Sequence, residues 1–413
     1  MKGWAQVKVN KAVTVLLGAV SMAAVSAPQA LSATSATSAA PAADARLIVV
    51  AVGGNDTGAG TLEDPLATIQ AAVDGSGPGD TIAVRGGTYE LTDNITIATS
   101  GKAGSPITLT NYSGEHVVID GERLPASHTP VGGSIPRAER GAIHQEASYW
   151  RIQGLEIIRG PYGIYCAGCN DNEFTGLTTR DNYESGFQLQ GASSRNLITN
   201  LDSYANHDPR KNGESADGLA IKEGQGEGNR VRGARLWNNA DDGFDAWQFT
   251  SAISIENTIA YGNGFNRWNF PDFTGDGNGF KMGGGGDVDP AADHSLLNSL
   301  AFRNAAHGIT DNGNPGNLAI SRTTTYRNGG SGFRTDRSHA TLDANLSLLD
   351  TEPVHLGSST SKGNSWDLGG VWNESSVRST DPATITGPRA ADGSIPSSPF
   401  LVPRDGSALG ARF

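Results

Sequence analysis

An aromatic residue stands two positions before an asparagine in five segments of this chain, and this repeated register limits the possible folds more than any other feature. The five pairs are Tyr204/Asn206, Trp237/Asn239, Tyr261/Asn263, Phe302/Asn304 and Tyr326/Asn328. Asn182 keeps the register, with Arg180 in place of the aromatic residue. A pattern that returns in this way indicates an architecture of stacked repeats.

A glycine marks a second position of the repeat. The seven glycines are Gly163, Gly186, Gly218, Gly243, Gly279, Gly308 and Gly332, at steps of 23 to 36 residues. An apolar residue follows every one of them: Ile164, Phe187, Leu219, Phe244, Phe280, Ile309 and Phe333. Runs such as Ile253-Ser254-Ile255 alternate apolar and polar residues, which is typical of strands with one buried face.

Short strands at this spacing, without helical periodicity between them, predict a parallel β-helix. Each coil of such a solenoid buries its inner face only by stacking on its neighbours. The apolar column then lies inside, and the asparagine column forms a ladder of side-chain hydrogen bonds between coils. A β-sandwich or a propeller is the alternative. A sandwich has no reason to keep one asparagine-to-glycine register, and a propeller blade usually needs more residues.

The two ends of the repeat region differ from its middle. Residues 66–73 have helical spacing and are followed by Gly75, Pro78 and Gly79, so we expect a capping helix. Strands are expected at residues 81–84, 95–97 and 107–109. Residues 365–413 lose the repeat and are expected to cover the last coil. Residues 47–413 are therefore interpreted as one domain, with capped ends because a solenoid otherwise exposes unpaired strands.

The N-terminus has the pattern of a secretory signal. Lys2, Lys8 and Lys11 precede an apolar run over residues 13–25, and small residues follow up to Ala33. We expect residues 1–33 to be a signal peptide, residues 34–46 to be a flexible leader, and the protein to be secreted. A retained anchor helix is the alternative, although the run is short for a membrane span.

The net charge of the chain limits the classes of partner that it can bind. The net charge of −12 argues against a nucleic-acid partner, which would require a basic face. We expect no membrane partner and a monomer.

The two cysteines, Cys166 and Cys169, are interpreted as structural; a short disulfide between them is one possibility in an exported chain. Neither a zinc site nor a thioredoxin-like site fits, because neither His ligands nor a βαβ context accompany them.

Four aspartates point to a metal site. Asp217 and Asp242 both precede a repeat glycine and thus occupy the same place in adjacent coils, about 4.8 Å apart. Asp241 and Asp245 belong to the second of these coils. Asp245 stands two residues after Gly243, a position that we call Gly+2. Gly+2 should face solvent, because the residue directly after the glycine points inward. The four carboxylates are therefore expected on one external patch, where they repel one another unless a cation is present. Calcium, which takes 6–8 oxygen ligands, fits best. The alternative is an acidic surface patch.

A second acidic segment, Asp287, Asp289 and Asp293, is a weaker candidate for a calcium loop than for a solvated glycine-rich turn.

Lys281 stands at Gly+2 in the next coil, the same column as Asp245. The simplest interpretation is an ion pair between the two. The asparagine-to-glycine gap, however, lengthens to twelve residues before Gly218 and sixteen before Gly279, and these insertions flank the acidic coil. The second insertion carries Phe265, Trp268, Phe270 and Phe273, which suit sugar rings beside a groove. Because binding and catalytic residues are often found on or beside lengthened loops, Lys281 is a candidate for a catalytic residue.

Three segments in order resemble the pectate lyases of polysaccharide lyase family nine: residues 216–222 (ADGLAIK), 239–245 (NADDGFD) and 277–283 (GNGFKMG). The resemblance covers roughly residues 47–400 and implies a secreted, right-handed parallel β-helix. It also implies that Asp217, Asp241, Asp242 and Asp245 hold calcium and that Lys281 is the catalytic base. Ala220 and the short end after Leu401 depart from what the family leads us to expect.

The implied reaction is β-elimination on a polyuronate such as pectate, which leaves a 4,5-unsaturated product and works best in alkali. Arg303 and Arg334 are expected to hold substrate carboxylates. Three alternatives remain: a lyase for another uronate polymer, a polygalacturonase-like hydrolase, and a non-catalytic carbohydrate-binding β-helix. The hydrolase is disfavoured because its Asn-Thr-Asp and Arg-Ile-Lys segments are missing, and Ala306-His307-Gly308 only partly resembles its Gly-His-Gly.

Overall fold

The computed structural model describes residues 45–285 and 290–413. The expected signal peptide, nearly all of the expected leader, and Asp287 and Asp289 of the second acidic segment lie outside this part. Arg46, the last residue of the expected leader, is held by an ion pair with Asp80 at 2.6 Å.

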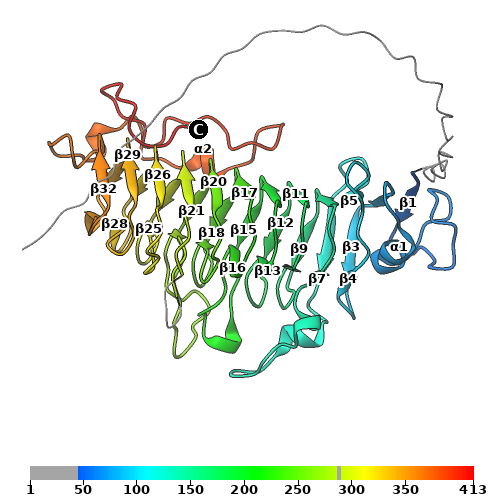
Figure 1. Ribbon diagram of the computed structural model, residues 1–413. Helices are drawn as coiled ribbons and strands as arrows, with labels where there is room; N and C mark the ends of the chain where they lie inside the picture. Colours follow the sequence, from blue (N-terminus) through cyan, green and yellow to red (C-terminus); the bar gives the residue numbers. More distant parts are fainter. Residues whose placement is uncertain (1–44, 286–289) are drawn as a thin grey trace, which may run out of the picture. The chain divides into compact units, whose positions relative to one another are not determined.

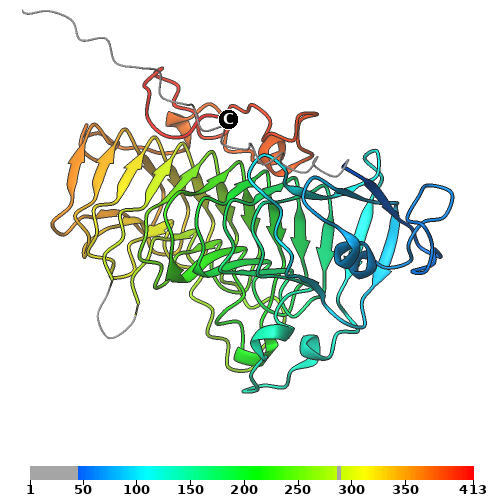
Figure 2. The ribbon, with the colours of Figure 1, turned by 45° about the vertical axis from the view of Figure 1, so that its right-hand side comes forward.

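The described part of the chain forms a solenoid of three parallel sheets, which we call A, B and C (Figures 1 and 2). From Thr81 onwards, the chain passes from A to B to C and then returns to A one layer further on. Every pairing between named strands is parallel, which confirms the predicted parallel β-helix. Four short 3-10 helices, η1 (Pro125–His128), η2 (Arg137–Glu139), η3 (Pro209–Lys211) and η4 (Glu374–Ser376), lie outside the sheets.

Sheet A consists of β1 (Leu47–Val50), β2 (Thr81–Val84), β5 (Ile107–Asn111), β8 (Trp150–Gln153), β11 (Glu173–Thr175), β14 (Leu197–Thr199), β17 (Asn229–Arg232), β20 (Ile253–Glu256), β23 (Ser295–Leu297), β26 (Ala319–Ser321), β29 (Thr341–Asp343) and β32 (Thr360–Lys362). Sheet B consists of β3 (Gly87–Glu90), β6 (Val117–Asp120), β9 (Glu156–Ile158), β12 (Thr178–Arg180), β15 (Asp202–Tyr204), β18 (Arg235–Trp237), β21 (Ile259–Tyr261), β24 (Leu300–Phe302), β27 (Thr324–Tyr326) and β30 (Leu346–Leu348). Sheet C consists of β4 (Ile95–Ile97), β7 (Ile143–Gln145), β10 (Ile164–Ala167), β13 (Phe187–Ala192), β16 (Leu219–Gln225), β19 (Phe244–Asp245), β22 (Phe280–Lys281), β25 (Ile309–Thr310), β28 (Ser331–Arg334) and β31 (Glu352–His355).

The apolar column after the repeat glycines lies in register inside the solenoid. Each of its members pairs with the next, from Ile164 and Phe187 in β10 and β13 to Ile309 and Phe333 in β25 and β28. All seven side chains are fully buried. The next position therefore points outward in every coil, because side chains alternate across a strand.

The asparagine ladder is confirmed. The Nδ2 atom of each asparagine donates to Oδ1 of the next one at 2.8 to 3.0 Å, along Asn182, Asn206, Asn239, Asn263, Asn304 and Asn328. Asp350 accepts the last of these bonds at 2.8 Å. These buried polar groups are thus satisfied by their equivalents in neighbouring coils, which fixes the stacking register. The aromatic residues two positions earlier also stack, with Tyr204 and Trp237 4.2 Å apart.

A short helix closes the N-terminal end, as expected. Helix α1 (Ile69–Gly75) begins three residues later than the predicted segment because Thr68 caps it, accepting a hydrogen bond from the Ala71 amide. Leu66 instead forms a bridge with Val50. The buried side chains Ile69, Ala72 and Val73 pack the helix against the first coil.

The C-terminal segment does more than cover the last coil. Trp366 packs on Phe333 in that region, but later residues run back along sheet B (Figures 1 and 2). Phe400 packs edge-on against Phe302, and Arg235 donates to the carbonyls of Ile385 and Gly387 around α2 (Ala383–Thr386). The segment thus buries the outer aromatic stack of sheet B.

Cys166 and Cys169 form a disulfide, which agrees with a structural role. Among residues 45–285 and 290–413, no helix has the length and apolar character needed to cross a bilayer.

Candidate active site

A cleft of about 550 Å³ lies over the outer surface of sheet C. It is lined by residues of β16, β19 and β22, by the residues after η2 and by the loops before β16 and β22. Its charged lining residues are Arg140, Glu184, Arg210, Lys211, Glu214, Lys222, Glu223, Asp241, Asp245, Asp276 and Lys281.

The two insertions noted in the sequence build one wall of this cleft together. Thr274 in the second insertion bonds to the carbonyls of Asn212 and Lys211 in the first. Phe273 packs so closely on Gly213 that a Cβ there would lie 2.6 Å from its ring; Gly213 also has φ +97°. A larger side chain at this position would therefore separate the loops.

The four predicted aspartates do converge, but they are not exposed to solvent. Asp217, Asp241, Asp242 and Asp245 are each at most 2% exposed. The inserted loops cover them: the Asp276 amide donates to Asp241 at 2.6 Å, and the Asn278 amide donates to Asp242 at 2.6 Å. The expectation of a solvent-facing patch is wrong because strand alternation only places these side chains outside the core.

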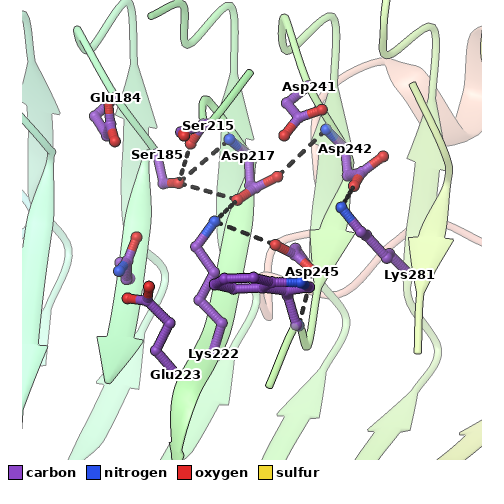
Figure 3. A network of polar contacts seen from close by, with 12 residues as sticks. Glu184, Ser185, Ser215, Asp217, Lys222, Glu223, Asp241, Asp242, Asp245 and Lys281 are labelled. Atoms are coloured by element: carbon purple, nitrogen blue, oxygen red, sulfur yellow. Dashed lines mark hydrogen bonds and ion pairs between the residues drawn. The ribbon is translucent and has the colours of Figure 1, made fainter. Parts of the chain in front are cut away.

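Asp217, Asp242 and Asp245 form one compact group of carboxylates. One oxygen from each lies within 4.8 Å of the others. Asp241, Asp242 and Asp276 form a second such group, which shares Asp242 with the first. Figure 3 shows the side chains of the four predicted aspartates turned toward one region beside Lys222 and Lys281.

Two lysines partly neutralise this cluster. Lys222 Nζ donates to Asp217 at 2.8 Å and to Asp245 at 3.1 Å (Figure 3). Lys281 pairs with Asp245 in backbone register, as predicted from the Gly+2 column. Its ammonium group, however, lies 2.7 Å from Asp276 and 3.3 Å from Asp242. The simple ion pair between Lys281 and Asp245 is therefore wrong, because Lys222 takes that position.

Burial and mutual repulsion set the protonation of the aspartates. Burial raises the pKa of Asp217 to about 7, against the opposing effect of Lys222. Burial likewise raises the pKa of Asp242 to about 6 and that of Asp241 well above its ordinary value. The pKa of Asp245 is lowered, because Lys281 and Lys222 together outweigh its burial.

The aspartates in turn raise the pKa of both lysines. Burial lowers the pKa of Lys281, but the charges of Asp245, Asp242 and Asp241 raise it by more, so the ammonium form is favoured. The pKa of Lys222 is also raised above its usual value, since Asp217 and Asp245 outweigh its burial.

The site is suited to a hard cation. Fully ionised, its five carboxylates exceed its two ammonium groups by three charges. Asp242 Oδ2 is buried, and among the described residues its polar partner is Lys281 Nζ in the ion pair at 3.3 Å, without a hydrogen bond. Such an oxygen, among carboxylates that share one region, is the type of ligand that calcium binds.

Of the two arginines expected to bind substrate, only Arg334 lies on the site's sheet. Lys281 pairs with Thr310, which pairs with Arg334, so Arg334 is two strands from Lys281 in the predicted column. It forms an ion pair with Asp336 at 3.1 Å. Arg303 instead follows β24 in sheet B, near Glu374 of the C-terminal segment. Arg303 is not among the described residues that line the cleft, so its position gives no support to the expected substrate contact.

The aromatic residues of the second insertion do not form the surface of the cleft. Trp268 lies parallel to His207 at 5.1 Å, and Phe270 lies 6.2 Å from Trp268. Neither these two nor Phe265 and Phe273 belong to the described residues lining the cleft. Trp268, Phe270 and Phe273 pack against the first insertion and thus help to hold the wall, whereas Phe265 is largely exposed.

Comparison with known proteins agrees with this architecture. Residues 48–345 match the family model described as "Pel9A-like, right handed beta helix region". Pectate lyase PEL9 of Emericella nidulans is 50% identical over 384 residues, covering 88% of this chain and 94% of the relative. The chain belongs to the pectate lyases of family nine.

Three further similar proteins share less of their sequence with this chain. Pectate lyase L of Dickeya chrysanthemi is 34% identical over 365 residues, with 86% of this chain and 82% of the relative covered. The crystal structure of pectate lyase Pel9A superimposes with a TM-score of 0.76 at 32% identity, covering 88% of this chain and 90% of the other. A rhamnogalacturonan lyase shares the fold, with a TM-score of 0.78 at 24% identity.

Several charged residues of this pectate lyase's cleft were not predicted from the sequence, and Lys222, Asp276 and Arg140 are three of them. Lys222 is four residues after Gly218, so it shares the outward face with position Gly+2; this signal was available. Asp276 lies in an insertion without a repeat register, so its approach to Lys281 had no sequence signal. Arg140 lies 105 residues before Asp245 and reaches the cleft through the long loop between β6 and β7.

Proposed function

We propose that this enzyme is a calcium-dependent lyase that cleaves polygalacturonate, or pectate, by β-elimination to 4,5-unsaturated oligogalacturonides. The observation that carries the proposal is the placement of Lys281 Nζ beside the buried aspartate cluster in an open cleft, in a chain of the pectate lyase family. Lys281 is proposed as the Brønsted base, and the enzyme as secreted and monomeric.

Asp217, Asp241, Asp242 and Asp245 would hold the calcium ion. When bound between these residues and a uronate carboxylate, calcium withdraws electron density and makes the neighbouring C5 proton more acidic. Asp276 is a further carboxylate at the edge of this set, and it holds Lys281 by an ion pair.

The elimination can be written in terms of this chain's own residues. Neutral Lys281 Nζ takes the proton from C5 of a galacturonate unit. The electrons of the C5–H bond form the C4–C5 double bond, and the bond between C4 and the glycosidic oxygen breaks. We propose that water protonates the leaving oxygen. The carboxylates around Lys281 favour its ammonium form, so activity should rise with pH.

Cations along the cleft fit a polyuronate. Arg140 lines the cleft and forms no ion pair with the carboxylates of the described residues. Its guanidinium is held by the Tyr165 hydroxyl at 3.3 Å and lies 5.4 Å from the Tyr165 ring centroid. Tyr165 is three strands from Asp245 in the Gly+2 column, roughly 14 Å away at the strand spacing of sheets. We propose that Arg140 binds the carboxylate of a uronate unit that lies on the Tyr165 side of Lys281.

The test is a panel of polyuronides assayed for ultraviolet absorbance of the unsaturated product, with and without chelator. Polygalacturonate should give this absorbance, excess EDTA should abolish it, and added calcium should restore it. Asp242→Asn should require more calcium. Full turnover in excess EDTA would contradict the calcium assignment, and polymer cleavage without absorbance would indicate a hydrolase instead.

A further inference from the structure

A second groove lies on the far side of the solenoid from the active site. It has a volume of about 980 Å³ and is formed between the A-to-B turns and the C-terminal segment. Figures 1 and 2 show this segment on the opposite side of the sheets from the loops that carry η1 and η3. The floor consists of successive turns after β20, β23 and β26, which contribute Asn257, Asn298 and Arg322.

The wall of the groove is firmly attached to its floor. The Arg412 amide donates to Asn298 Oδ1 at 2.7 Å, and Asn298 Nδ2 donates to the Arg412 carbonyl at 2.8 Å. Gly410 bonds to the carbonyl of Ala344 at 2.8 Å. Phe400, packed on Phe302, holds the middle of the segment. The groove is therefore a built feature of the folded domain.

Three arginines and one glutamate, Glu256, line this groove. Arg322, Arg378 and Arg412 all line it, and none forms an ion pair with a carboxylate in residues 45–285 or 290–413. The glutamate of the groove, Glu256, is instead paired with Arg232 at the end of β17, and Arg327 after β27 is paired with Glu374. The Arg412 guanidinium donates to the carbonyls of Ser407, Leu409 and Ala411, so Arg322 and Arg378 are the cations of the groove best placed to meet a ligand.

The remaining lining is polar and includes unused hydrogen-bonding capacity. Ser397, Ser398 and Ser407 offer hydroxyl groups, and Asn257 offers an amide. Ser407 Oγ is buried and has no hydrogen-bond partner among the described residues. Burial and the neighbouring charge of Arg378 lower the pKa of Arg412 against the opposing charge of Asp405, so the two cations lie close enough to repel. An anion placed between them would relieve that repulsion.

We propose that this groove is a second binding site for an anionic polysaccharide, separate from the catalytic cleft. Guanidinium groups match carboxylates, serine and asparagine side chains match sugar hydroxyls, and the volume suits several sugar units better than a single small anion. The choice of a polyuronate as ligand rests on the proposed function. Binding there would keep the enzyme attached to its polymer while the cleft acts on another segment.

The test compares two double variants in an enzyme that carries Lys281→Ala. Arg322→Glu/Arg378→Glu alters the groove. Arg230→Glu/Arg337→Glu makes the same charge change at exposed sites outside it. Native gels containing polygalacturonate, dextran sulfate or neutral dextran measure retardation, each normalised to a polymer-free gel.

The groove variant should need about tenfold more polygalacturonate for half-retardation, as expected for losing charge-assisted hydrogen bonds, while the control matches its parent. Introduced into the Lys281-containing enzyme, the groove changes should leave turnover of trigalacturonate unchanged. Equal retardation of the two variants, or a loss seen with dextran sulfate alone, overturns the proposal. Arg322→Gln/Arg378→Gln should show a smaller loss in the same direction. Cleavage by the Lys281→Ala parent would count against the proposed base and would leave this binding result intact.

Discussion

Lys281 and Lys222 both lie on the outer face of sheet C and meet the same group of aspartates, yet their surroundings differ. Lys222 is enclosed by Asp217 and Asp245, which both belong to the proposed calcium set. Lys281 contacts Asp242 of that set and also Asp276 from a loop. Both lysines line the cleft and are similarly buried, with side chains 12% exposed for Lys222 and 10% for Lys281. Lys281 is the proposed base because one of its two carboxylate partners lies outside the proposed calcium set.

We expect Lys281→Ala to lose about 10²–10⁴-fold in kcat, the usual contribution of a general base. Lys281→Arg should fail almost equally, because a guanidinium stays protonated. The measurements are kcat and calcium affinity for both variants, with Lys362→Ala at an exposed site as control. Substantial turnover by the arginine variant, with an unchanged pH profile, would show that Lys281 serves only as an ion-pair partner.

Arg140 provides a second residue-scale prediction. Removing its charge by Arg140→Gln should raise KM on polygalacturonate about tenfold with little change in kcat, since a substrate contact made equally in the ground and transition states is lost. Arg334→Gln should act in the same direction on the other side of Lys281. Steady-state kinetics of both, with Arg230→Gln in sheet A as control, would decide. An unchanged KM would remove the residue from the substrate site.

At the scale of elements, the asparagine ladder links successive turns of the solenoid through buried side chains. Asn263 accepts from both the amide and the side chain of Asn239, and donates to Asn304 and to the Leu236 carbonyl. All of these groups are buried. Removing the Asn263 side chain therefore breaks hydrogen bonds to the coils on both sides of it, one of which carries Asp241 and Asp242.

Asn263→Ala should lower the free energy of unfolding by about 3 kcal/mol or more, because each buried polar group left unsatisfied costs about 1–3 kcal/mol. Urea or thermal unfolding would measure this. Asn317→Ala is the matched control, since Asn317 is exposed and outside the ladder. A loss no greater than that of the control would mean that the ladder does not contribute to stability.

At the scale of the whole molecule, the C-terminal segment connects distant coils. Arg389 and Arg235 share Asp202 of β15, while Phe400 contacts Phe302 and Tyr326 of β24 and β27. The segment therefore crosses several layers of the solenoid and shields an outer aromatic stack that would otherwise expose a large apolar surface.

Phe400→Ala should cost about 3–5 kcal/mol, as expected for a buried phenylalanine, and should loosen the segment before the solenoid unfolds. Limited proteolysis should cut residues 378–413 faster in this variant, with calcium binding retained. Phe265→Ala, at a residue 44% exposed, is the control. Unchanged proteolysis would show that the polar contacts of Arg235 and Arg389 hold the segment alone.

The sequence by itself determined the parallel β-helix, the asparagine ladder, and which residues share a column. It could do so because strand alternation and coil stacking are local rules that the chain repeats: Asp245 and Lys281 were placed side by side across 36 residues without any tertiary information. The convergence of Asp217, Asp241 and Asp242 followed from the same register.

Only the tertiary structure decided the burial of these aspartates, the partners of Lys281 and the path of the C-terminal segment. The physical reason is that insertions and the final 49 residues carry no repeat register, so nothing in the sequence specifies where they pack. Asp276 and Asn278 close over the cluster from such an insertion, and Arg140 enters from another loop. The outward direction of a side chain follows from its strand, whereas its exposure depends on whatever folds over it.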